Sequence, residues 1–143
     1  PKGNPNNIRG VADLLTPRLR YVNRQKGSGT RILIDYLCKS AGIDTACLYG
    51  YDREEFTHTA VAALVAAGSA DAGLGIYSAA KLYGLDFIPV CDEQYDLLVP
   101  DYAWDTLLIR RLLEILQSAE FRRRLDRLGG YALENPGTVR ERF

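Results

Sequence analysis

The stretch that decides the fold is YVNRQKGSGTR, residues 21–31, whose pattern predicts a short strand, a glycine turn and the start of a helix. Gly27 and Gly29 allow backbone amides to approach a ligand closely. Ser28 and Thr30 add hydroxyl groups, and the start of a helix offers unpaired amides and the positive end of its dipole. The turn is therefore typical of an anion-binding loop.

Length and composition bound the class of protein. The chain has 143 residues, of which 47% are hydrophobic, so it can form one domain with a buried core. Lys and Arg together number 18, as do Asp and Glu, so no net charge attracts nucleic acid or an anionic membrane. The apolar runs are short, and the first residues lack the pattern of a signal peptide. We expect a cytoplasmic protein that binds neither nucleic acid nor a membrane.

Cysteine and histidine are too sparse for a structural metal site. The three cysteines, Cys38, Cys47 and Cys91, are widely spaced, and His58 is the single histidine. No Cys-x-x-Cys or Cys/His cluster occurs, which argues against a zinc site and a disulfide framework. We expect reduced cysteines, no metal and no cofactor. The chain also contains no methionine, even at position 1, which suggests part of a longer polypeptide.

The remaining pattern predicts strands that alternate with helices. The predicted strands are residues 20–23, 46–49, 72–76, 87–90 and 96–99. The predicted helices are residues 30–41, 58–67 and 78–83, with further amphipathic helices from Trp104 onward. This alternation favours an α/β fold with a mostly parallel sheet covered on both faces. Ligands of such sheets lie beyond the carboxyl ends of the strands, where the glycine turn is placed.

The two common nucleotide motifs do not fit the glycine turn. A P-loop requires a Lys-Ser or Lys-Thr pair after its second glycine, whereas Lys26 precedes the turn. The dinucleotide fingerprint G-x-G-x-x-G requires a third glycine where GSGTRI has Ile32. A nucleophilic set of Ser28, His58 and Asp71 lacks the G-x-S-x-G elbow, so we expect no catalysis by this segment.

Three longer segments match a known family together. They are YVNRQKGSGTRILIDYL, then GYDREEFTHTAVAALVAAGSADAGLGIYSAAKLYGLDFIPV, then DEQYDLLVP, and the opening GNPNNIRGVADLL is also similar. The run from Arg20 to Pro100 resembles the periplasmic-binding-protein-like domain that occurs beside MoeA-type molybdopterin-biosynthesis domains or helix-turn-helix regulators of molybdate metabolism. The resemblance weakens after Leu116.

This resemblance implies a type II periplasmic-binding-protein-like fold, with two three-layer α/β/α lobes and a ligand cleft between them. Residues 1–143 would be a single partial domain, in which 1–19 end the entry to lobe 1, 20–76 form lobe 2 and 77–143 return to lobe 1. The first strands of lobe 1 would precede residue 1. Their absence would expose a sheet edge and apolar surface, so we hypothesise that copies of the chain dimerise or exchange elements.

The candidate ligand contacts at the cleft are Ser28, Gly29, Thr30, Arg31, Thr57, His58 and Tyr77. The first four belong to the glycine turn, and the helix predicted from residue 58 would aim a second N-terminus at the same cleft. Other roles stay open. Arg31 could lie along the helix in solvent, Thr57 could act only as an N-cap, and His58 could be a structural hydrogen bonder.

The resemblance implies a non-catalytic sensory or accessory module for a small oxyanion such as molybdate or tungstate. A fused or partner MoeA-type or helix-turn-helix domain would receive the signal of lobe closure. Three alternatives stay open: a LysR-type effector domain for an organic acid, a part of a molybdopterin-biosynthesis enzyme, and a lobe that has lost its ligand.

Overall fold

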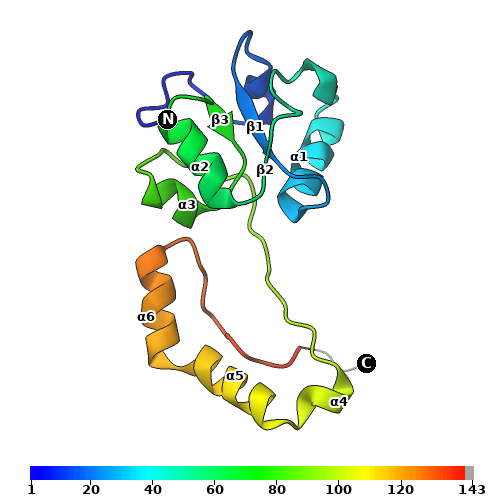
Figure 1. The fold of residues 1–143 in the computed structure, drawn as a ribbon, viewed down its shortest axis with the longest axis vertical. Coiled ribbons are helices and arrows are strands. Elements are labelled where there is room, and N and C mark those ends of the chain that lie inside the picture. Colours follow the sequence, from blue (N-terminus) through cyan, green and yellow to red (C-terminus); the bar gives the residue numbers. More distant parts are fainter. Residues whose placement is uncertain (141–143) are drawn as a thin grey trace. The chain divides into compact units, whose positions relative to one another are not determined.

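The computed structural model describes residues 1–140, which divide after Val90 into two compact units (Figure 1). The first unit carries a small parallel sheet with helices on both of its faces. The second unit is helical within its described residues. The glycine turn belongs to the first unit, so that unit carries the candidate site.

Three parallel strands form the sheet in the order β2-β1-β3 (Figure 1). Their bounds are β1 Tyr21–Arg24, β2 Glu54–Glu55 and β3 Ala72–Gly73. The central strand aligns Asn23 with Glu54 on one side and Val22 with Gly73 on the other. All residues of β1 are buried, as expected for a central strand that is covered on both faces.

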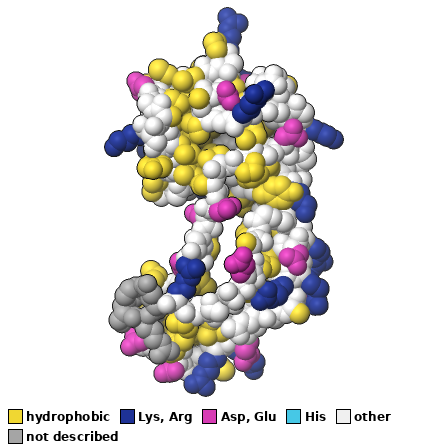
Figure 2. Space-filling model, turned by 180° about the vertical axis from the view of Figure 1, so that it is seen from behind, with side chains coloured by type: hydrophobic (Ala, Val, Ile, Leu, Met, Phe, Trp, Pro, Cys, Tyr) yellow, Lys and Arg dark blue, Asp and Glu magenta, His cyan; other side chains and the backbone are white. Residues whose placement is uncertain are grey.

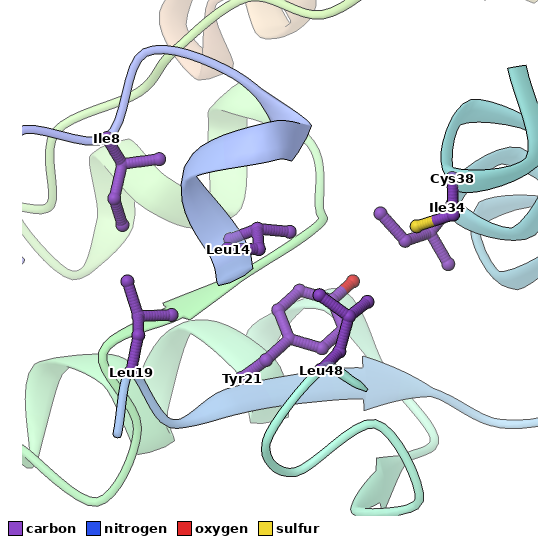
Figure 3. Close-up of a cluster of buried hydrophobic side chains, with 7 residues drawn as sticks. All are labelled: Ile8, Leu14, Leu19, Tyr21, Ile34, Cys38 and Leu48. Atoms are coloured by element: carbon purple, nitrogen blue, oxygen red, sulfur yellow. The ribbon is translucent and has the colours of Figure 1, made fainter. Parts of the chain in front are cut away.

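Helices α1 (Gly29–Ser40) and α2 (His58–Ala66) pack against opposite faces of β1. Successive side chains of a strand alternate between the two faces. Tyr21 therefore packs in the cluster that includes Ile34 of α1 (Figure 3), whereas Val22 packs with Val61 of α2. The first crossover, from β1 to β2, and the second, from β2 to β3, run in opposite directions along the sheet, which sends their helices to opposite faces.

Shorter elements complete the first unit. They are the 3-10 turns η1 (Val11–Leu15) and η2 (Thr45–Cys47) and the helix α3 (Tyr77–Leu82). Gly42, Gly68 and Gly84 lie just after α1, α2 and α3 with positive φ, the conformation in which glycine commonly ends a helix.

The second unit contains α4 (Asp101–Trp104), α5 (Leu107–Gln117) and α6 (Ala119–Leu128). Within this unit, α5 contacts both α4 and α6. None of the three helices has a buried residue, and large apolar side chains such as Leu108 and Ile115 are exposed. Hydrophobic side chains also reach the surface of the first unit, as the opposite view shows (Figure 2). Across residues 1–140, every helix is too short or too polar to cross a bilayer.

Three predicted strands are wrong. Residues 46–49 contain the end of η2. The Asp44 carboxylate accepts a hydrogen bond from the Ala46 amide at 3.0 Å, and this bond holds a tight turn. The strand that pairs with β1 lies later, at Glu54–Glu55. Residues 87–90 and 96–99 belong to no strand, because a strand needs a hydrogen-bonded neighbour and the described sheet ends at β3.

Candidate functional site

The carboxyl ends of the parallel strands lie at one edge of the sheet, and the chain passes from there into α1, α2 and α3. The chain leaves β1 toward the face covered by α1, and it leaves β2 toward the face covered by α2. Neighbouring strands whose connections diverge in this way create a crevice at their carboxyl ends, which is where open α/β sheets bind ligands. The candidate site is therefore the edge between β1 and β2.

The glycine turn presents two amides at this edge. Ser28 is the N-cap of α1, and its Oγ accepts the Arg31 amide at 3.1 Å. Gly27 has a φ of +86°, a conformation that favours glycine. Within the described residues, the amides of Gly29 and Thr30 donate to no protein group. The turn thus combines a hydroxyl that stabilises the helix with two amides that are open to a ligand.

The start of α2 lies at the same edge. The Oγ1 of Thr57 accepts the Ala60 amide at 3.0 Å and lies 3.0 Å from the hydroxyl of Thr59. The predicted N-cap role of Thr57 is therefore confirmed. His58 is half-buried, and its Nδ1 lies 3.6 Å from the point that a Cβ on Gly75 would occupy. The first turn of α2 thus adjoins the chain that leaves β3.

Arg31 is engaged within the protein. Its side chain is 6% exposed, and its Nη1 donates to Glu54 Oε1 at 2.8 Å. Its Nε lies 3.2 Å from Tyr51 Oη and 3.3 Å from Asp35 Oδ1, and the guanidinium lies 4.1 Å from the centre of the Tyr51 ring. Burial opposes its charge, but the bonds to Tyr51 and Glu54 outweigh that effect and raise the pKa of Arg31. Arg31 therefore joins α1 to β2, and its contact with a ligand stays a prediction.

Arg24 is the last residue of β1. The sequence motifs did not identify it as a candidate ligand contact. It is only 8% exposed. Its Nε donates to Gln25 Oε1 at 3.2 Å and its Nη2 donates to the carbonyl of Phe56 at 3.1 Å. Its Nη1 is buried and has no hydrogen-bond partner among residues 1–140. The available signal was an arginine shortly before the glycine turn, separated from Gly27 by Gln25 and Lys26, but its contact with Phe56 joins residues that are distant in sequence.

Tyr77 begins α3 but turns to another part of the unit. Its ring packs edge-to-face against Phe87, with 5.4 Å between the ring centroids. Together with Lys81 and Leu85 it lines an open hollow of about 630 Å³, which does not include the glycine turn. Its contact with a ligand at the edge between β1 and β2 stays a prediction.

Asp71 lies at the opposite edge of the sheet, just before β3. Its carboxylate accepts from the Arg20 guanidinium at 2.7 and 2.9 Å and from the Arg20 amide at 2.8 Å. These bonds lower the pKa of Asp71 below its ordinary value. The ion pair ties the start of β1 to the start of β3. Within the described residues, no group of three His, Cys, Asp or Glu side chains could hold a metal ion.

Comparison with known proteins gives a family and two relatives. The family model described as PBP superfamily domain matches residues 1–117. Uncharacterized protein YvgK of Bacillus subtilis (strain 168) is 41% identical over 138 residues, which are 96% of this chain and 44% of that protein. An uncharacterized protein in the 5′ region of a 2Fe-2S ferredoxin gene of Clostridium pasteurianum is 36% identical over 109 residues, 76% of this chain and 96% of that protein.

The chain therefore spans less than half of the Bacillus relative and nearly all of the Clostridium relative. No solved structure matches it with significant similarity. The matched family covers the whole first unit, including β1, the glycine turn and the start of α2.

Proposed function

Since the chain belongs to the PBP superfamily of domains, we propose that it binds a small anion at the edge of the sheet between β1 and β2. The observation that carries this proposal is the placement of two helix N-termini at that edge. The starts of α1 and α2 both lie there, and the amides of Gly29 and Thr30 are open among the described residues. Helix N-termini attract anions through such amides and through their dipoles.

We further propose that residues 20–76 form one lobe of a type II domain whose second lobe closes over the anion. An anion that contacts both lobes only in the closed form would shift the population toward that form. Closure would then signal to an attached or partner domain. The resemblance of the segments from Arg20 to Pro100 supports molybdate or tungstate as the anion and a MoeA-type or helix-turn-helix domain as the receiver.

A carboxylate ligand, as in a LysR-type effector domain, is the second candidate. The observation that favours it is the buried guanidinium of Arg24, which ends β1 and contacts the Phe56 carbonyl before α2. Arginine presents a planar fork of donors that suits a carboxylate at least as well as a tetrahedral oxyanion.

Thermal unfolding of the chain with sodium molybdate, tungstate, sulfate, phosphate or succinate tests the proposal. A ligand at about 100 times its Kd stabilises the folded state by about 2.7 kcal/mol, which raises the Tm of a domain of this size by about 5 to 10 °C. Sodium chloride at matched ionic strength is the control. Selective stabilisation by at least one anion is expected, and equal melting temperatures in all salts would refute the proposal.

A further inference from the structure

We propose that Arg24 is the charged anchor of the ligand, so that the site requires an oxyanion and rejects neutral and cationic molecules. This inference rests on the proposed function, because it names the residue and the ligand charge at the same edge. Arg24 ends β1, and its guanidinium contacts the Phe56 carbonyl just before α2 begins. It therefore lies where the connections of β1 and β2 diverge.

The face on which Arg24 lies follows from strand alternation. Val22 of β1 packs against α2, and Arg24 is two residues further along the same strand. Its head group is held from two directions, by Gln25 Oε1 at 3.2 Å and by Phe56 O at 3.1 Å. Both contacts are neutral acceptors, so they position the guanidinium without neutralising it. The remaining nitrogen, Nη1, is buried and unpartnered among the described residues.

A buried charge without a counter-ion is costly, and proteins normally pair it. The acidic groups of this sheet that form ion pairs are committed elsewhere, Glu54 to Arg31 and Asp71 to Arg20. Glu55 is aligned with Arg24 across β1 and β2, yet it forms no ion pair with it within residues 1–140. In our proposal, the ligand therefore supplies the negative charge that balances Arg24.

This geometry defines the ligand chemistry. One ligand oxygen would accept from Nη1 of Arg24, and others would accept from the amides of Gly29 and Thr30. Carboxylates and tetrahedral oxyanions both offer several oxygens around a delocalised negative charge. A lysine cannot replace Arg24, because its single ammonium cannot hold the Gln25 and Phe56 contacts and still reach the ligand with the same geometry.

Isothermal titration calorimetry tests the proposal with sodium molybdate, phosphate and succinate, which separate tetrahedral anions from carboxylates. The variants are Arg24→Gln, Arg24→Lys and the matched control Glu55→Gln, each checked for folding by circular dichroism. We expect both Arg24 variants to lose at least about tenfold in affinity, the effect of about 1.4 kcal/mol. Glu55→Gln, which removes a negative charge beside the site, should bind equally well or more tightly.

The outcomes distinguish this inference from the proposed function. If the unmodified chain binds none of the anions, both fail. If it binds one and Arg24→Gln binds that anion within about threefold, only the role of Arg24 is refuted. If both Arg24 variants fail to fold, the Arg24 Nε–H resonance of the unmodified chain decides by NMR. A saturable shift of that resonance with the anion supports the proposal, and an unchanged resonance while the anion binds overturns it.

Discussion

Ser28→Asp separates the capping role of Ser28 from the anion site beside it. Ser28 Oγ accepts the Arg31 amide at 3.1 Å, and Asp caps helices about as well as Ser. The free energy of unfolding should therefore change by no more than about 0.5 kcal/mol. The new carboxylate, however, would lie next to the open amides of Gly29 and Thr30.

The expected loss of binding follows from Coulomb repulsion. An anion bound by those amides would lie about 4 to 5 Å from the Asp carboxylate, where two like charges repel by about 3 to 4 kcal/mol at an effective dielectric constant of about 20. Affinity should fall at least about 100-fold. Isothermal titration calorimetry measures it, with Ser118→Asp at the N-cap of α6 as the matched control. Unchanged affinity in a folded Ser28→Asp variant would refute the placement of the anion at the start of α1.

Two further predictions concern the frame that holds the site. Gly50 has a φ of +95°, and a Cβ there would collide with the carbonyl oxygen of Tyr21 in β1. Gly50→Ala should therefore lower the free energy of unfolding, measured with urea, by about 2 to 5 kcal/mol. Gly42→Ala is the control and should lower it by about 1 to 2 kcal/mol, because Gly42 has a positive φ but no neighbouring atom near the added Cβ. Equal losses of unfolding free energy in the two variants would contradict the close packing of Gly50 against Tyr21. Asp71→Asn should lower the free energy of unfolding near neutral pH, because the Arg20 bonds hold the pKa of Asp71 below its ordinary value of 3.8. The contribution of Asp71 is complete above that value and is lost as pH falls through the lowered pKa, so the deficit of the variant should shrink in acid. A deficit that is constant with pH would argue against this ion pair.

The sequence predicted the helices of the first unit well because their signals are local. The apolar positions of α1 repeat with helical spacing, whereas α2 is a run of small apolar residues, and each helix carries its own N-cap and terminal glycine. Strand β1 was also predicted, within one residue at each end. Strand β2 could not be predicted in the same way. Glu54 and Glu55 have no apolar alternation, and they form a strand only because β1 offers backbone partners.

The candidate site was predicted in part. The glycine turn was predicted at the carboxyl ends of the strands and the start of α2 at the same inter-lobe cleft; the structure shows both helix starts at the carboxyl ends of β1 and β2, and the cleft itself stays a prediction. The different roles of the two arginines depend on contacts across the fold. Arg31 is buried against Tyr51 and Glu54, and Arg24 against the carbonyl of Phe56. Neither neighbourhood is visible in the spacing of the sequence, because the partners lie on different elements.

The most direct measurement of the central claim is an NMR titration of the ¹⁵N-labelled chain with the anion that raises the melting temperature most. The account predicts saturable shifts that are largest at the amides of Gly29 and Thr30, with smaller shifts at the amide of Thr59 in the first turn of α2. Shifts that saturate elsewhere in the chain and leave Gly29 and Thr30 unchanged would contradict it.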